Sequence, residues 1–113
     1  MLSVTRVGVQ SAAQASKPAE SPAGNAEIGK RLFTKYGCYE CHGRQAQGSL
    51  LLGPRLGPDP VPFEVVISYI RKPTGEMPPY TDKVVSDKEV ADIYVFLQSL
   101  PHPPAAKTIP ILK

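Results

Sequence analysis

Prolines limit the length of every regular segment in this chain. The sequence contains 13 prolines in 113 residues, more than twice the usual share of about 5%. Proline lacks a backbone N–H and fixes φ, so it interrupts a helix wherever it falls in the interior. We therefore expect short regular segments that are joined by stiff connections.

The length of the chain allows one domain. Residues 1–25 are rich in Ala, Ser, Gln and Pro without periodicity, which predicts an arm or the remnant of a signal region. Ala13-Gln14-Ala15 fits an A-x-A cleavage site, although Arg6 and Gln10 interrupt the apolar stretch before it. Residues 101–113 contain four prolines and predict an extended tail that lies against the domain or a partner. The ordered domain is expected over residues 26–100.

Three segments of this domain have the apolar periodicity of helices. Each is bounded by capping or breaking residues, among them Asn25 before the first segment, Gly37 after it and a capping box that begins at Ser86. The helices are expected over Ala26–Tyr36, over Pro62–Lys72, and from Ser86 to the residue before Pro101. No strong period-two run appears, so the sequence predicts an all-α fold.

The only two cysteines lie in Cys38-Tyr39-Glu40-Cys41-His42. This C-x-x-C-H spacing is the attachment signature of haem c. The two thiols form thioethers with the two vinyl groups of one porphyrin, and the adjacent histidine offers a nitrogen to the iron. A buried porphyrin would also add apolar bulk to a chain that has eight aromatic residues and no tryptophan.

Three other uses of the motif are weaker. A thioredoxin-type dithiol needs a βαβ context, which the pattern of this chain lacks. A zinc site would have only His42 and His102 as further histidine ligands, and they do not form the usual H-x3–5-H pair. A structural disulfide would span a gap of only two residues and would make the following histidine a coincidence.

Over residues 26–100 the chain resembles a class I c-type cytochrome. The resemblance rests on a first helix with Gly29 and Phe33, the C-Y-E-C-H segment as a loop, Gly53-Pro54-Arg55-Leu56, Met77-Pro78-Pro79-Tyr80 and an apolar last helix. It implies one covalently bound haem wrapped by three or more short helices, with the first and last helices crossed. Gly29 and Phe33 would then meet the face that bears Tyr94 and Leu97.

Met77 is the predicted second iron ligand beside His42. It lies in a proline-rich loop between two helices, where this family usually takes its methionine, and His/Met ligation raises the reduction potential. The alternatives are a Met77 that only fills the core, as most methionines do, and ligation by His102 in the tail.

The resemblance also implies other contacts with the haem. His42 would donate its second ring N–H to the carbonyl of Pro54, and Leu56 would pack on the haem edge. Apart from the resemblance, Tyr69 and Tyr80 are candidates to line the pocket or reach the propionates, with core packing as the equal alternative. Arg55 and Arg71 are candidates to pair with a propionate, although most arginines are simply exposed.

The predicted function is one-electron transfer between a periplasmic donor and a downstream acceptor. The long tails suggest a cytochrome subunit of a dehydrogenase complex that they embrace. A haem enzyme or a gas-binding protein with an open sixth iron position is the alternative, and it needs distal acid–base residues.

The charge and the hydropathy of the chain bear on its partners and its location. The formal net charge is +3 without a cluster of Lys and Arg, which does not favour nucleic-acid binding. No stretch approaches the roughly 18 apolar residues of a membrane span. Haem attachment to C-x-x-C-H takes place outside the bacterial cytoplasm, so we expect a periplasmic protein, with an organellar cytochrome as the alternative.

Overall fold

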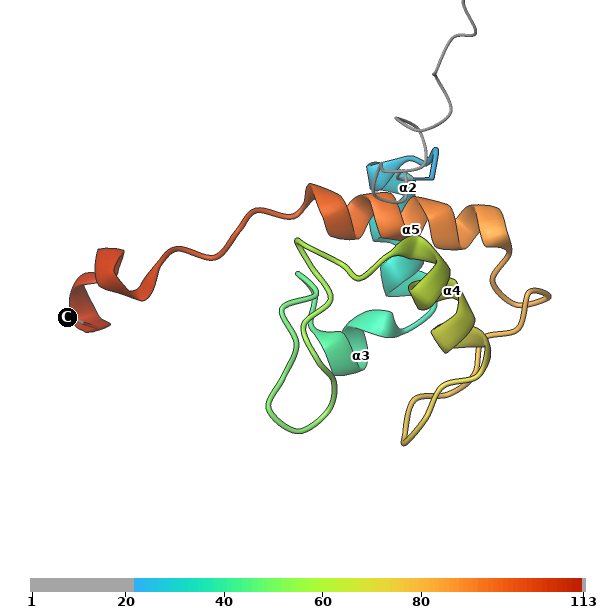
Figure 1. Ribbon diagram of the computed structural model, residues 1–113, viewed down its shortest axis with the longest axis horizontal. Helices are drawn as coiled ribbons and strands as arrows, with labels where there is room; N and C mark the ends of the chain where they lie inside the picture. The colour runs from blue at the N-terminus through green and yellow to red at the C-terminus, as the bar shows by residue number, and fades with distance from the viewer. Residues whose placement is uncertain (1–21, 113) are drawn as a thin grey trace, which may run out of the picture.

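The computed structural model describes residues 22–112, and this part of the chain is helical without strands (Figure 1). The predicted all-α fold is confirmed. Most of the predicted arm, residues 1–21, lies outside the described residues. The elements are α2 (Ala26–Lys35), α3 (Cys38–His42), α4 (Phe63–Arg71), α5 (Asp87–Ser99) and the 3-10 turns η1 (Ala106–Thr108) and η2 (Pro110–Leu112).

The helix ends follow the capping residues that the sequence contains. The Asn25 side chain accepts the Ile28 N–H at 3.0 Å and begins α2. At α5, Ser86 and Glu89 form a reciprocal capping box, with bonds of 3.2 and 3.1 Å. Gly37 has φ 77° and ends the first helical segment in the left-handed region. The predicted helices therefore agree with the observed ones to within about one residue at each end.

The helices α2 and α5 pack closely and cross, with α2 passing behind α5 in Figure 1. Gly29 permits this approach, because a Cβ there would overlap the backbone carbonyl of Asp92 and lie 2.9 Å from Phe96 Cβ. One turn along α2, the ring of Phe33 packs against that of Phe96 with centroids 5.5 Å apart. The crossing of the first and last helices is as predicted.

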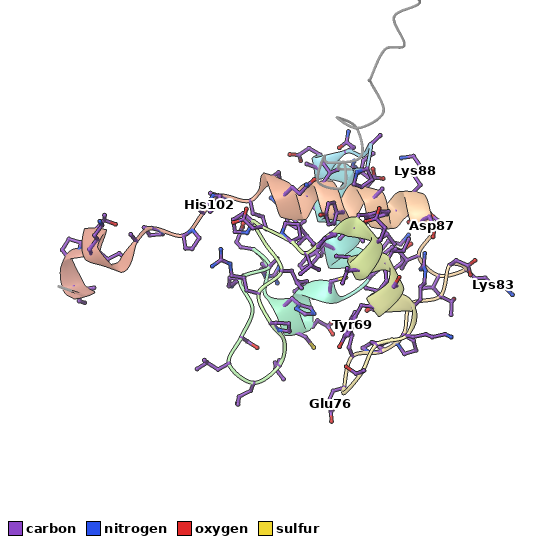
Figure 2. The ribbon with its side chains drawn as sticks, in the orientation of Figure 1. Tyr69, Glu76, Lys83, Asp87, Lys88 and His102 are labelled. Carbon is purple, nitrogen blue, oxygen red and sulfur yellow. The ribbon has the colours of Figure 1, made fainter. Side chains whose placement is uncertain are left out.

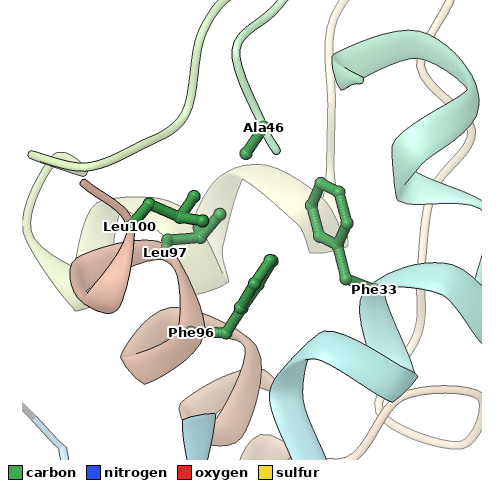
Figure 3. Close-up of a cluster of buried hydrophobic side chains, with 5 residues drawn as sticks. All are labelled: Phe33, Ala46, Phe96, Leu97 and Leu100. Carbon is green, nitrogen blue, oxygen red and sulfur yellow. The ribbon is translucent and has the colours of Figure 1, made fainter. Parts of the chain in front are cut away.

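The contacting face of α5 differs in part from the expectation. Gly29 meets Asp92 and Phe96, while Tyr94 turns to α4 and packs edge-on against Phe63 at a centroid distance of 5.4 Å. The reason is that α5 is buried on two sides, so residues outside the predicted stripe also have partners. The core cluster around this crossing, shown in Figure 3, consists of Phe33, Ala46, Phe96, Leu97 and Leu100.

Asp92 is a charged residue in this packed interface, with only 2% of its surface exposed. Its carboxylate accepts the backbone N–H of Asn25 at 2.8 Å, and its second oxygen lies 3.4 Å from the ammonium of Lys88. A buried carboxylate is tolerated only with such partners. Asp92 thereby ties the start of α2 to the middle of α5.

The segment after α5 leaves the body of the molecule instead of folding back on it (Figure 1). At its base, His102 Nε2 lies 3.0 Å from a carboxylate oxygen of Asp59. The turns η1 and η2 were not predicted. Each spans only three residues, and Pro110 stands first in η2, where its missing N–H would have no partner in any case. None of the helices in the described residues is long and apolar enough to cross a membrane.

Candidate functional site

The C-x-x-C-H motif forms the single-turn helix α3 and is not the loop that the resemblance implied. Gly37 redirects the chain at φ 77°, and the N–H of Gly43, at φ 84°, closes the turn on the carbonyl of Tyr39 at 2.9 Å. Residues three and four apart lie on the same side of a helix. The helical turn therefore presents Cys38, Cys41 and His42 on one side.

The ring of His42 is held in one orientation. Its Nδ1 lies 2.7 Å from the carbonyl oxygen of Pro54, and only 8% of the residue is exposed. A carbonyl can only accept, so Nδ1 carries a proton, and in the neutral ring this leaves the lone pair on Nε2. Gly53 packs on the ring, since a Cβ there would lie 3.0 Å from Cε1 and Nδ1. The arrangement is that of a histidine prepared to bind a metal through Nε2.

Neither cysteine is in a disulfide. Burial raises the pKa of the half-buried Cys38 to about 11, whereas Cys41 is exposed. Thiol-redox proteins instead lower the pKa of the attacking cysteine, so this environment opposes the dithiol alternative. The zinc alternative finds no ligand set within residues 22–112, because no three His, Cys, Asp or Glu side chains gather there to hold a metal ion.

Met77 is half-buried in the loop between α4 and α5, and hydrogen bonds fasten that loop at both ends. Arg71 donates from Nη1 to the carbonyls of Tyr80, at 3.0 Å, and Val85, at 2.7 Å, and from Nη2 to Asp87 at 2.6 Å. The backbone N–H of Tyr80 also donates to Ile70 at 2.8 Å. Arg71 is therefore engaged by the protein itself, and its pairing with a propionate stays a prediction.

Tyr80 connects this loop with the cysteine motif. Its hydroxyl donates to the carbonyl of Tyr36, just before α3, at 2.6 Å. Burial, followed by the nearby thiols and Glu40, raises the pKa of Tyr80. The structure thus brings Tyr80 to the motif.

The remaining residues that the sequence suggested for the haem site have contacts within the protein. Leu56 is partly buried against the core cluster, and the Tyr69 hydroxyl lies 3.0 Å from Thr74 Oγ1. Arg55 donates from Nε to the carbonyl of Gly57 at 2.6 Å. Figure 2 shows His102 at the base of the tail and away from α3. Its Nε2 is paired with Asp59.

Sequence reasoning missed Ala46, which is fully buried and organises the chain after the motif. It has φ 52°, its N–H donates to the carbonyl of Gly43 at 3.0 Å, and its carbonyl accepts the N–H of Leu56 at 2.9 Å. This position needs a small side chain and a left-handed backbone. An alanine gives no sequence signal for either, because glycine or asparagine is the usual marker.

A comparison with protein families gives one match. The family described as cytochrome C oxidase, cbb3-type, subunit III, matches residues 24–97, which is more than half of the chain. The matched segment contains α2, α3, α4 and most of α5. Searches of the curated proteins and of the solved structures gave no match.

Proposed function

The chain belongs to the c-type cytochrome family described as cytochrome C oxidase, cbb3-type, subunit III, and on this premise we propose that it is a single-haem electron carrier between two proteins of the bacterial periplasm. Haem-based electron transfer is the function of the domain that the family match identifies. Cytochrome c domains are typically exported, and the periplasm as the compartment is our proposal.

The proposed attachment uses Cys38 and Cys41 for the two thioethers and His42 as one axial ligand. The observation that carries it is the 2.7 Å bond from His42 Nδ1 to Pro54 O. This bond leaves Nε2 as the free ligand atom on the helical turn that presents both thiols. A haem bound here would supply an iron that can change its charge by one electron.

The rest of the site fits a large apolar group. None of the residues of α4 is fully buried, although its sequence is rich in Val, Ile and Tyr. Val65 and Tyr69 are 52% and 43% exposed. A porphyrin against this face would remove apolar surface from water, at about 25 cal/mol per Å². Leu56 and Tyr80 are proposed to border the same pocket.

Met77 is the proposed second axial ligand. Its loop is fastened by Arg71 and by Tyr80, and Pro78 and Pro79 follow it directly. A thioether held in this way favours ferrous iron and excludes small ligands. No observation on the described residues favours the alternative of an open iron position.

An absorption spectrum of the holoprotein tests the proposal. We expect c-type bands on reduction, together with a weak far-red band in the oxidised form that the Met77→Ala variant lacks. Rapid binding of carbon monoxide to the reduced native protein would instead support a gas-binding or enzymatic role. A colourless protein, made together with haem-attachment machinery, would contradict the assignment altogether.

The proposed partners are a periplasmic dehydrogenase as donor, of which this chain is a cytochrome subunit, and a terminal acceptor. The name of the matched family refers to an oxidase subunit, which fits an oxidase as acceptor. The tail, held at its base by His102 and Asp59, is proposed to lie on the dehydrogenase. A chain that ends at residue 104 and binds the dehydrogenase as well as the full chain does would remove this role of the tail.

A further inference from the structure

Three consecutive leucines form an exposed tip close to the cysteine motif. The exposed fractions of Leu50, Leu51 and Leu52 are 103%, 94% and 66%. They lie on the loop that follows α3 and projects beside it in Figure 1. Water-exposed leucines in one contiguous group indicate a binding surface more often than single exposed apolar residues do.

The leucine tip, residues 50–52, is held in place by its own base. Ser49 donates its N–H to the carbonyl of Gly53 at 2.8 Å, and the N–H of Leu52 donates to the Ser49 hydroxyl at 3.0 Å. The Ser49 hydroxyl in turn donates to the carbonyl of Cys41 at 3.4 Å. The tip is therefore ordered relative to α3 before it meets a partner, which lowers the entropic cost of binding.

The haem does not account for this exposure. Nδ1 of His42 faces Pro54, and Gly53 packs on the same edge of the ring. The proposed iron lies on the opposite nitrogen, Nε2. Gly53 and Pro54, which directly follow the tip, are thus on the side of His42 that would face away from the iron.

The charges around the tip specify what kind of surface fits it. From Cys41 to Pro58 the chain contains no acidic residue and two arginines, both exposed. Arg44 lies over the ring of Tyr39, 4.9 Å from its centroid, and Arg55 follows the tip. An apolar tip with a basic rim is complementary to an apolar depression with carboxylates at its rim.

We propose that the leucine tip, with Arg44 and Arg55 beside it, is the docking element for a redox protein that presents an acidic-rimmed apolar depression. The inference rests on the proposed function, because an electron carrier must bring its partner close to the attachment site. Since Ser49, at the base of the tip, donates a hydrogen bond to the carbonyl of Cys41, a partner seated on the tip would lie close to the attachment segment. Small contacts of this kind suit transient electron-transfer complexes.

The test is a stopped-flow measurement of the reduction of the oxidised holoprotein by a purified, reduced, acidic flavodoxin. Each encounter transfers one electron from the flavin to the ferric iron. The double variant Leu51→Ser, Leu52→Ser is expected to lower the second-order rate about tenfold or more. The second-order rate should fall as ionic strength rises, and the Arg44→Gln variant is expected to show a smaller fall than the native protein. The matched control is Val61→Ser, which removes an apolar residue that is 56% exposed before α4 and should leave the rate unchanged.

Reduction by ascorbate needs no docking surface, so it distinguishes a failure of the proposed function from a failure of the docking element alone. Absent c-type bands, or failure of ascorbate to reduce the native protein, would refute the proposed function. With normal bands and normal ascorbate reduction, equal flavodoxin rates for the native protein and the leucine variant would refute the docking element alone. A third outcome would also overturn the proposal. If the native protein sediments with anionic phospholipid vesicles and the leucine variant does not, while both react with flavodoxin at the same rate, the tip binds a membrane.

Discussion

Replacing Arg71 by alanine should release the loop that carries Met77. The guanidinium is 20% exposed and donates to two backbone carbonyls and to Asp87. Each bond from a charged donor to a carbonyl contributes about 1.5–3 kcal/mol. Asp87 is 77% exposed, so its ion pair adds at most about 1 kcal/mol. Allowing for water that replaces the lost donor, we expect a total loss of about 3 kcal/mol.

This loss has a functional readout if Met77 binds the iron. An external ligand such as imidazole reaches ferric iron only in molecules whose loop is open, so its apparent Kd is the intrinsic Kd divided by the open fraction. A loss of about 3 kcal/mol corresponds to roughly a hundredfold change in an equilibrium constant. Because part of the loss falls on global unfolding, we expect imidazole to bind Arg71→Ala about 10 to 100 times more tightly than the native protein. A spectroscopic titration at fixed pH measures this.

Two variants make the result specific. Arg31→Ala removes an exposed arginine of α2 and should leave the imidazole affinity unchanged. Arg71→Lys keeps the charge but loses the forked geometry, so an intermediate affinity is expected. If Arg71→Ala unfolds more easily in urea and yet binds imidazole like the native protein, Arg71 supports the fold as a whole and the reasoning about the loop is wrong.

Three further predictions concern the helix pair and its caps. Gly29→Ala should lower the free energy of unfolding by about 1–3 kcal/mol through overpacking, as measured in urea, whereas Lys30→Ala on the exposed side should change it little. Asp92→Ala should cost about 1–3 kcal/mol because the Asn25 N–H loses its acceptor, and an unchanged midpoint would contradict this. The backbone N–H of the N-cap residue, followed by the Tyr36 hydroxyl, lowers the pKa of Glu89. Its stabilising effect is therefore present above the ordinary carboxyl pKa and is lost as pH falls through the lowered one. The stability difference between the native protein and Glu89→Gln should shrink from pH 6 to pH 3, and a constant difference would refute this account.

Local signals explain why the helices were predictable from the sequence. Asn25 and Ser86 cap their helices through contacts within three residues along the chain, and Gly37 ends the first helical segment through its own backbone angle. Such interactions need no knowledge of the tertiary fold. The spacing of Gly29 and Phe33 also indicated a close crossing, because a residue without a side chain next to a large ring marks a helix contact.

Contacts between distant residues explain most of what the sequence did not reveal. Asp92 looks like an ordinary exposed residue of a helix, and only its bond to Asn25, 67 residues earlier, accounts for its burial. Arg71 likewise gives no sequence signal of its partners, which are three acceptors from later segments. The contact between His102, at the base of the tail, and Asp59 also joins residues 43 positions apart.

Tyr36 joins the two sides of the proposed haem site through different atoms of one residue. Its carbonyl accepts the hydroxyl of Tyr80, at the end of the Met77 loop, and its own hydroxyl donates to Glu89 at 2.7 Å in the first turn of α5. Tyr36 also stands two residues before Cys38, at the entrance to α3. The segment that offers the thiols and His42 and the segment that offers Met77 are therefore fastened to the same point, and α5 braces that point. A displacement of the Met77 segment would therefore be transmitted through Tyr36 to the start of α3 and to the first turn of α5.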